Sequence, residues 1–271
     1  MDDNNNNKIV ADHWRGLDFY KPSSDRYSHA IIVGCGAIGS YAAFGLARMG
    51  VKKLTLIDYD VVEPHNLPNQ FFAESLNLTK DLLKTSVLAS TIKLMVKNVV
   101  IEEIPLKWEE IEDYYKLSQA TAIITAVDKM EIREMIFDNE FVNNYCQYLL
   151  DSRTGGLYAR IFAINMAVQQ QKDYYKSTLH SNEEAAPLPC SGQSIVDTSM
   201  AVSAELIGRY RSLVMKGFHP TLETFHDYST GTGWVQQVDK DNIKNCLSVD
   251  TSEENIDKIG SEPQNTEPRN G

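Results

Sequence analysis

The sequence predicts an α/β protein built on a Rossmann-like, doubly wound and mostly parallel sheet, with flanking helices and antiparallel C-terminal strands. Two observations carry this prediction. Short apolar runs alternate along the chain with segments of helical periodicity, which is typical of a parallel sheet covered on both faces. A glycine-rich turn over 34–39 also joins the first apolar run to the first helical segment.

The strands are expected where short apolar runs are bounded by turn residues. These runs lie at 30–33, 53–57, 99–104, 122–127, 147–150 and 158–164. Helical spacing predicts helices over 37–49, about 80–97, from Lys129 onward, and over 194–214. Thr79 can cap the second of these helices, which should present Leu83, Val87 and Leu94 to the core.

Three segments outside this pattern are rich in polar residues. Residues 1–7 are of low complexity, and 239–271 form an acidic tail with almost nothing to bury, so we expect disorder in both. The stretch over about 169–193 is polar and patternless, and it is long enough to predict a functional crossover loop. The chain therefore divides into an N-terminal segment (1–27), one domain (28–238) and a tail (239–271).

Composition excludes several functional classes. The formal charge of −11 and a pI near 5.0 argue against a broad nucleic-acid surface, which needs a basic stripe. No window approaches the roughly 18 apolar residues of a membrane span, and the acidic N-terminus does not resemble a signal peptide, so we expect a cytoplasmic protein. The four cysteines are far apart in the sequence, which argues against a structural zinc site or a disulfide framework.

The glycine-rich turn predicts a nucleotide site. Gly34 permits the tight turn, Gly36 leaves room for a phosphate, and Gly39 lets the helix approach the strand. The start of the helix, with Ala37 and Ile38, offers free N–H groups to an anion. Asp58 ends the second strand, 19 residues after Gly39, where a carboxylate can hold ribose hydroxyls. These residues alone do not distinguish NAD from ATP.

The segment that follows the second strand favours ATP over NAD. Its sequence from Asp58 to Phe71, DYDVVEPHNLPNQF, resembles the Asp-x-Asp…Asn-Leu-x-Arg-Gln-Phe signature of the ThiF/MoeB/HesA family, which includes the adenylating half of ubiquitin-activating enzymes. The resemblance extends from about Ser28 to Met215. It implies Mg²⁺-dependent use of ATP to adenylate the C-terminal carboxylate of a ubiquitin-like or sulfur-carrier protein, by an enzyme that forms a homodimer.

The resemblance also assigns roles to individual residues. Asp58 would bind the ATP ribose, Lys84 the phosphates, and Asp128 the magnesium ion. The other residues that the resemblance places around ATP are Asp60, Asn66, Asn69, Gln70, Val127 and Arg133.

The physical chemistry of two of these positions agrees with the assigned roles. Lys84 stands near a helix N-terminus, where a cation opposes the helix dipole until an anion binds between them. Asp128 lies at the carboxyl end of a parallel strand, where ligands bind in open α/β sheets. It could instead only cap the following helix, and the two roles are compatible.

Two positions depart from the family pattern, and a third, Cys190, has two interpretations. Asn69 stands where the family has a phosphate-binding arginine, and an arginine from a dimer partner, Arg15 or Arg26, could replace it. Lys129 replaces the usual asparagine after the metal-binding aspartate. Cys190 precedes the last long helix, where its thiolate would be favoured for attack on an acyl adenylate, although a cysteine here can also have no required role.

Two other functions remain as alternatives. A NAD-dependent oxidoreductase would need a catalytic pair such as Tyr-x-x-x-Lys, and none is convincing. A catalytically weak or inactive ThiF-like partner of another activating enzyme is favoured by Asn69 and opposed by the set of Asp58, Lys84 and Asp128.

Overall fold

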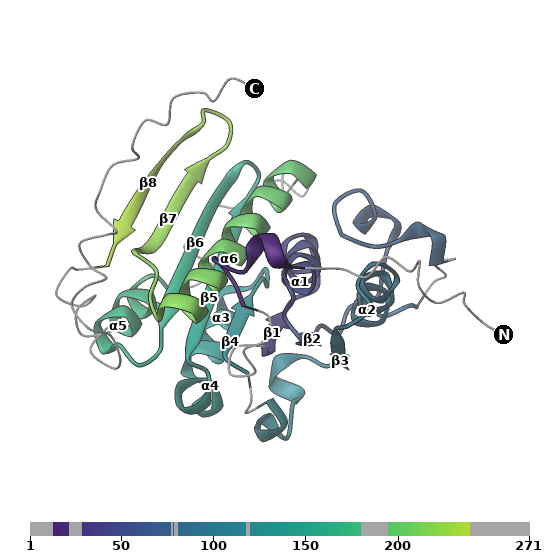
Figure 1. Ribbon diagram of the computed structural model, residues 1–271, viewed down its shortest axis with the longest axis horizontal. Coiled ribbons are helices and arrows are strands. Elements are labelled where there is room, and N and C mark those ends of the chain that lie inside the picture. Colours follow the sequence, from purple (N-terminus) through teal and green to yellow (C-terminus); the bar gives the residue numbers. More distant parts are fainter. Residues whose placement is uncertain are drawn as a thin grey trace.

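One eight-stranded mixed sheet forms the centre of the protein (Figure 1). The computed structural model describes residues 13–21, 29–76, 78, 81–117, 120–179 and 195–238. The strands are β1 (His29–Val33), β2 (Lys53–Ile57), β3 (Val100–Ile104), β4 (Ala122–Thr125), β5 (Tyr148–Gly155), β6 (Tyr158–Asn165), β7 (Thr221–Asp227) and β8 (Thr232–Gln237). Their order is β3-β2-β1-β4-β5-β6-β7-β8. The first five are parallel and the last three add antiparallel, which confirms the predicted fold class.

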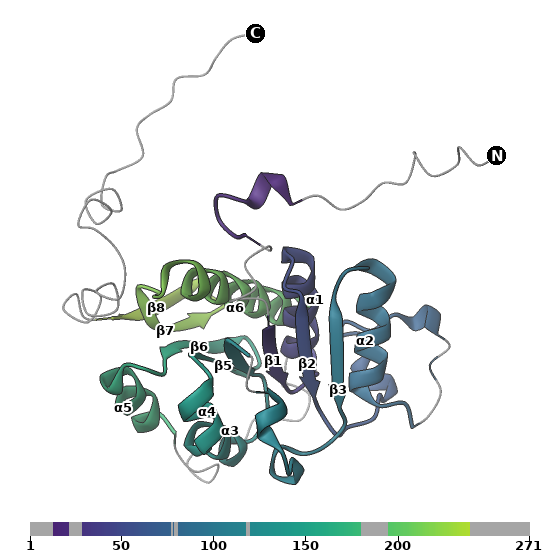
Figure 2. The ribbon, with the colours of Figure 1, turned by 60° about the horizontal axis from the view of Figure 1, so that its bottom comes forward.

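Helices cover both faces of this sheet (Figure 2). They are α1 (Ala37–Met49), α2 (Lys84–Met95), α3 (Met130–Asp138), α4 (Glu140–Tyr145), α5 (Gln169–Ser177) and α6 (Val196–Lys216). Short 3-10 helices are η1 (Trp14–Gly16), η3 (Pro64–Asn66), η4 (Glu74–Leu76), η5 (Trp108–Glu110) and η6 (Tyr114–Leu117). Helices α1, α2 and α6 lie on one face, and α3, α4 and α5 on the other.

The core consists of two apolar layers, one on each face of the sheet. Every residue of β1 and β4 is buried, because both strands are central and covered on both sides. Successive side chains of a strand alternate between the two layers: Ile31 belongs to one layer and Ile32 to the other. This explains why the central strands appear in the sequence as unbroken apolar runs.

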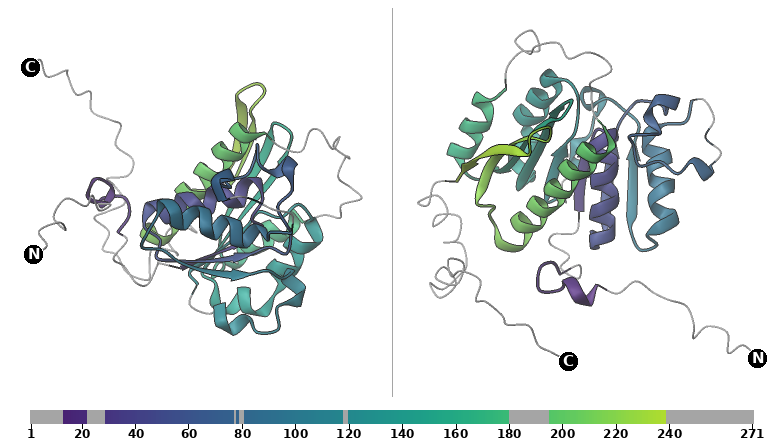
Figure 3. Two further views of the ribbon diagram at one scale, coloured as in Figure 1. Left: turned by 90° about the vertical axis from the view of Figure 1, so that its right-hand side faces the viewer. Right: turned by 90° about the horizontal axis from the view of Figure 1, so that it is seen from above.

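Helices α1 and α6 lie side by side (Figure 3, right). Gly45 permits this close approach, since a Cβ there would lie 2.2 Å from Cδ1 of Ile207. Tyr20, from the expected N-terminal segment, is also buried in this layer. Within the described residues, no helix combines the length and apolar character that crossing a bilayer requires.

The helix expected over about 80–97 is shorter than predicted. Helix α2 begins at Lys84 because the preceding Leu83 is extended and pairs with Val61 in a β-bridge. Val87 is buried as expected, whereas Leu94 is exposed and Leu83 is only partly buried. The expected cap, Thr79, lies outside the described residues.

The crossover expected to be a patternless loop over 169–193 begins with a helix. Residues Gln169–Ser177 form α5, which buries only Gln171 and Tyr175. The Gln171 side chain accepts a hydrogen bond from the N–H of Asn165 at 2.8 Å. A polar residue therefore occupies a buried position where helical periodicity would predict an apolar one. A helix that contacts the core through so few residues shows no apolar stripe in its sequence.

Candidate functional site

The glycine-rich turn lies where the strand order of the sheet reverses, at β1. Strand β1 pairs with β2 on one side and β4 on the other, and the chain leaves β1 at Val33 to enter α1 through 34–36. In open α/β sheets, a crevice forms outside the carboxyl ends of the strands at such a point. The topology therefore places the predicted nucleotide residues beside the carboxyl ends of the central strands.

Two of the three glycines are required by close backbone contacts. Gly34 has a φ of +92°, and a Cβ there would lie 2.5 Å from the carbonyl oxygen of Ala126. A Cβ on Gly39 would lie 1.8 Å from the carbonyl oxygen of Gly34. At Gly36, by contrast, a Cβ would meet no atom within 4 Å. Within the described part of the chain, Gly36 thus borders open space at the start of α1, and as the N-cap residue it has no side chain to bond the helix amides.

The Asp58 carboxylate fixes this turn from the neighbouring strand. Its Oδ2 accepts a hydrogen bond from the N–H of Cys35 at 2.7 Å, and Oδ1 accepts one from the N–H of Asp60 at 2.9 Å. Burial raises the pKa of Asp58, although these two bonds and Lys84 oppose the shift. Each carboxylate oxygen keeps a second lone pair, with which it could accept a hydrogen bond from a sugar hydroxyl.

Lys84 joins the same group of charges. Its Nζ lies 2.7 Å from Oδ2 of Asp60, and its N–H donates to the Asp60 carbonyl at 2.9 Å. Burial by itself lowers the pKa of Lys84, but the bond to Asp60 and the charge of Asp58 outweigh it and leave that pKa raised. A charged ammonium therefore stands at the first residue of α2.

The amide residues of the signature differ in how they are used. Asn66 is buried and accepts a hydrogen bond from the N–H of Glu63 at 2.9 Å, which fixes the turn. Oε1 of Gln70 is buried and has no hydrogen-bond partner among the residues that the structure describes. Since buried acceptors nearly always have a donor, a ligand with a suitable N–H or O–H would satisfy this atom.

Asn69, which stands in place of the family arginine, contacts the last long helix. Oγ of Ser199 on α6 donates to Oδ1 of Asn69 at 3.1 Å. One turn later, Ser203 donates to the carbonyl of Ile38 in α1 at 2.9 Å. Ser199 and Ser203 thus hold the start of α6 against the glycine turn and against the segment that carries Asn69. Sequence reasoning missed both serines, because a serine within a helix carries no distinctive signal.

The predicted residues at the end of β4 point in different directions. Asp128 is exposed, two residues beyond Ala126, which borders Gly34. Arg133 is buried and donates to the carbonyls of Val127 and Ser152 and to the carboxylate of Asp151. Its guanidinium is thus engaged inside the protein, and the predicted contact of Arg133 with ATP stays a prediction.

The predicted metal and thiol chemistry involves Asp128 and the cysteines. Within the described ranges, no group of three or more His, Cys, Asp or Glu residues is placed to hold a metal ion, so Mg²⁺ on Asp128 would need oxygens of the nucleotide. Burial raises the pKa of Cys35 and of Cys146, which fits unreactive thiols. Cys190 and Arg26 lie outside the described residues.

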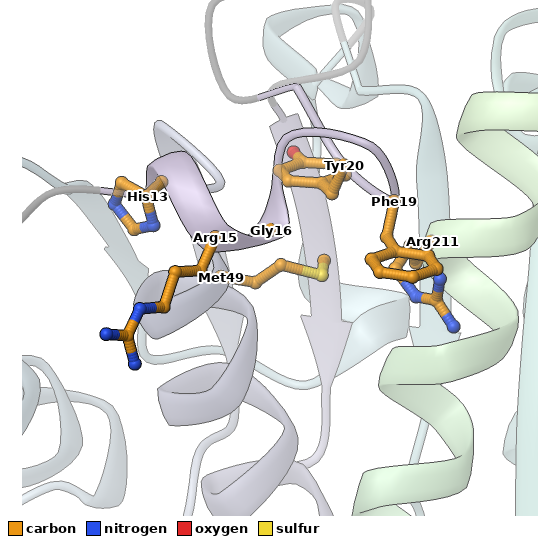
Figure 4. Close-up of a pocket in the computed structure, with 7 residues that line it drawn as sticks. All are labelled: His13, Arg15, Gly16, Phe19, Tyr20, Met49 and Arg211. Carbon is orange, nitrogen blue, oxygen red and sulfur yellow. The ribbon is translucent and has the colours of Figure 1, made fainter. Parts of the chain in front are cut away.

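Arg15 lies far from the glycine turn of its own chain. It lines a cavity of about 520 Å³ next to Met49, the last residue of α1, whose 13 residues span about 20 Å (Figure 4). The residues lining this cavity are His13, Arg15, Gly16, Phe19, Tyr20, Met49 and Arg211. In Figure 4 the side chains of Arg15 and Arg211 point apart, so the cavity does not gather its cations around one anion. A partner's Arg15 supplying the missing charge stays a prediction.

Comparison with known proteins identifies the family. The model of the ThiF family matches residues 24–248, which is most of the chain. The chain belongs to the ThiF family. Its curated relatives fall in several groups, and the matched segments span less than half of each relative described below.

This ThiF-family protein is 39% identical over 77 residues to ubiquitin-like modifier-activating enzyme 5 of Drosophila melanogaster, covering 28% of this chain and 18% of that one. It is 27% identical over 122 residues to the molybdopterin-synthase adenylyltransferase of Haemophilus influenzae, covering 45% and 49% of the two chains. It is also 39% identical over 70 residues to the tRNA threonylcarbamoyladenosine dehydratase of Haemophilus influenzae, covering 26% of each.

Solved structures support the fold. PaaA superposes with a TM-score of 0.62 at 14% identity, over 88% of this chain and 78% of that one. The complex of Escherichia coli MccB with ATP superposes with a TM-score of 0.58 at 19% identity, over 83% and 70% of the two chains.

Proposed function

We propose that this protein adenylates the C-terminal carboxylate of a ubiquitin-like or sulfur-carrier protein, or of a peptide, at the expense of ATP. The observation that carries the proposal is the convergence of Asp58, Asp60 and Lys84 on the glycine turn. Asp58 is bonded to the turn through Cys35, and Asp58 and Lys84 interact electrostatically. The free space at Gly36 and the Oε1 of Gln70, which has no partner within the described ranges, support a nucleotide here.

The reaction needs charge and position rather than proton transfer. A carboxylate oxygen of the substrate forms a bond to the α-phosphorus of ATP, and the bond from that phosphorus to the bridging oxygen of pyrophosphate breaks. The attacking carboxylate is already ionised near neutral pH, so no general base is required. In this proposal the N–H groups at the start of α1 and the Lys84 ammonium stabilise the charge on the phosphates.

Asp128 is the proposed magnesium ligand. Mg²⁺, when bound, would neutralise phosphate oxygens and favour the departure of pyrophosphate. Asp128 suits this role because it is exposed, acidic and close in sequence to Ala126, which packs on Gly34. Carboxylate oxygens are also the ligands that this ion prefers.

A row of three aromatic side chains, of which the outer two are exposed, favours a macromolecular substrate. Tyr158, Phe225 and Trp234 stack across β6, β7 and β8 with ring centroids 6.1 and 5.9 Å apart. Tyr158 is paired with Gly155, and β5 continues to Gly155 beyond the pairing of Asp151 with Thr125 that ends β4. The row therefore begins at the end of the sheet where the parallel strands terminate, which is also the end that carries Asp58. A protein or peptide docked there could direct its carboxylate toward the glycine turn.

ATP–pyrophosphate exchange with candidate β-grasp proteins and peptides tests the proposal. Lys84→Ala and Asp128→Ala should each reduce exchange by about 100-fold or more, since each removes charge that stabilises the transition state. Lys93→Ala, on the exposed side of the same helix, and Glu134→Ala on α3 are matched controls and should exchange as the wild type does. Exchange that is absent from the wild type, or that survives both changes, would reject the proposal.

The proposal also includes a second chemical step and an oligomeric state. A thiolate at Cys190 would attack the acyl adenylate, form a thioester and release AMP. Mass spectrometry after incubation with ATP and substrate would show a covalent adduct on Cys190 that Cys190→Ser removes, and an AMP adduct alone would exclude this step. We also propose a homodimer, which light scattering during size-exclusion chromatography would contradict by showing only monomer.

A non-catalytic partner of another activating enzyme is the second candidate. The Asn69 side chain, in place of the family arginine, is hydrogen-bonded to Ser199 and supplies no charge to a phosphate. If this candidate is correct, the protein binds nucleotide without exchange. Asn69→Arg, which restores the family residue, would then be the change that introduces exchange.

A further inference from the structure

A buried carboxylate on β5 has no part in the chemistry described so far. Asp151 has no exposed surface and pairs with Thr125 across β4 and β5. Four donors surround it, two on each oxygen. Oδ1 accepts from Oγ1 of Thr125 at 2.6 Å and Nε of Arg133 at 2.9 Å, and Oδ2 accepts from Nε of Arg153 at 2.8 Å and the hydroxyl of Tyr175 at 3.0 Å. We refer to Thr125, Arg133, Asp151, Arg153 and Tyr175 as the Asp151 cluster.

Arg133 connects this cluster to the end of β4. Its Nε is bonded to Asp151, and its Nη2 donates to the carbonyls of Val127 and Ser152. Val127 immediately precedes Asp128. The guanidinium therefore fixes the backbone just before the proposed magnesium ligand, and Asp151 fixes the guanidinium.

Arg153 connects the same carboxylate to the end of α5. Its Nη1 donates to the carbonyl of Thr178 at 2.8 Å and its Nη2 to the hydroxyl of Thr178 at 3.0 Å. The guanidinium also lies over the ring of Phe162, 4.3 Å from its centroid. Asp151 thus has one arginine directed to each of two segments, the end of β4 and the end of α5.

The charges make Asp151 the member on which the cluster depends. Arg133 and Arg153 are both largely buried, and Asp151 is the acidic partner with which each forms a salt bridge. Burial by itself raises the pKa of Asp151, but the two guanidinium groups outweigh it and hold that pKa below its usual range. Replacing this carboxylate leaves two buried cations without a counter-charge, so both arginines would move toward water.

We propose that Asp151 is a positioning residue, which acts through Arg133 to hold the Val127–Asp128 backbone in place for metal binding. The catalytic consequence rests on the proposed function, whereas the effect on the backbone does not. Neighbouring residues of β5, such as Leu149 and Leu150, are apolar and fully buried, so the strand forms its core contacts without any acid. An acid at 151 is needed because it sets the direction of the two arginines.

The test compares Asp151 with a second buried acid on the same face of the sheet. Glu223 on β7 is equally inaccessible, but it accepts from Arg160 on β6 and from the hydroxyl of Tyr174 on α5. Asp151→Asn and Glu223→Gln therefore both disturb a buried ion pair. Arg133→Lys is the second variant; it keeps the charge beside Asp151 and loses the forked contact with Val127 and Ser152.

Hydrogen–deuterium exchange of the free protein gives the first readout. Asp151→Asn and Arg133→Lys should accelerate exchange in a peptide covering 126–130 by about tenfold, and Glu223→Gln should leave it unchanged. The second readout is the Mg²⁺ concentration that half-saturates binding of a nonhydrolysable ATP analogue. This concentration should rise by about tenfold or more in Asp151→Asn and Arg133→Lys but not in Glu223→Gln, while binding of the analogue without Mg²⁺ stays the same.

These readouts separate the two proposals. Exchange over 126–130 that is unchanged in Arg133→Lys, or that rises equally in Glu223→Gln, would overturn the positioning role. A wild-type protein that binds no ATP analogue would reject the proposed function, and the exchange data would still decide the role of Asp151.

Discussion

Replacing Gly39 by alanine would place a methyl group between α1 and the turn that precedes it. The new Cβ would lie 1.8 Å from the carbonyl oxygen of Gly34 and 3.2 Å from Cγ2 of Ile32. Both partners belong to the backbone or to a fully buried side chain, so neither can rotate away. The start of α1 and the turn at Gly34 must therefore separate.

The size of the effect follows from these distances. Contacts of a Cβ below 3.0 Å essentially do not occur, so the separation must reach at least 1.2 Å, the difference between 3.0 and 1.8 Å. Overpacking of this kind costs about 1–3 kcal/mol or more. The higher helix propensity of alanine returns up to about 1 kcal/mol. We expect a net loss of about 1–2 kcal/mol in the free energy of unfolding, with more than tenfold weaker nucleotide binding.

Two further glycines provide matched controls for the same substitution. Gly208 lies within α6 with nothing within 4 Å of its Cβ position, so Gly208→Ala should stabilise by about 0.5–1 kcal/mol and leave binding unchanged. Gly36→Ala meets no protein atom either, so its stability should stay within about 0.5 kcal/mol of the wild type. Its methyl group would occupy the space proposed for a phosphate, so binding should weaken at least about tenfold.

Urea unfolding and calorimetric titration with an ATP analogue measure the two effects separately. The reasoning predicts that Gly39→Ala loses stability and binding, Gly36→Ala loses binding alone, and Gly208→Ala loses neither. Wild-type stability in Gly39→Ala would contradict the close contact with Gly34. Wild-type affinity in Gly36→Ala would show that phosphate does not approach this turn.

Three further outcomes concern buried groups. Iodoacetamide should leave Cys35 and Cys146 unmodified in the native protein near neutral pH, because burial raises the pKa of both thiols, to about 12 for Cys146; peptide mapping that finds either one alkylated would refute this. Burial lowers the pKa of His29 from 6.5 to about 4, so its contribution to stability is complete above about pH 6.5 and is lost as the pH falls toward about 4, by up to about 3 kcal/mol. Urea unfolding across that interval should show the loss, and His29→Asn should flatten the profile. Arg209→Met should cost about 3 kcal/mol by the same assay, because Arg209 is buried and donates to the carbonyl of Ile161, whereas Arg211→Met should cost less than about 1 kcal/mol.

The fold could be predicted because its central strands are buried and mostly apolar. Helix α1 and strand β2 have the bounds that the pattern predicts, since Gly50 ends the helix with a φ of +106° and β2 is buried after its first residue. Helix α5 could not be predicted, because it buries only Gln171 and Tyr175, with Tyr174 partly buried against the core. The start of α2 depends on a β-bridge between Val61 and Leu83, which no local pattern shows.

The candidate site was predicted only as far as its residues are close in sequence. The spacing of Gly34, Gly39 and Asp58 identified the turn and its acid, because these residues belong to one strand–helix–strand unit. The role of Asp151 was missed, because its partners come from β4, α3, β5 and α5 and only the fold brings them together. One signal was available: a lone acid within the buried run from Tyr148 to Ser152.

The hydroxyl contacts of α6 have a consequence for the order in which the protein is made. Ser199 and Asn69 are 130 positions apart, and Ser203 and Ile38 are 165 apart. A nascent chain that ends at β6 already contains the glycine turn, Asp58 and Lys84, but not α6, whose serines bond to Asn69 and Ile38. Such long-range contacts form late in folding. The hydrogen bonds from α6 to Asn69 and Ile38 can therefore form only after α6 has left the ribosome, so the glycine-rich turn gains these contacts late in co-translational folding.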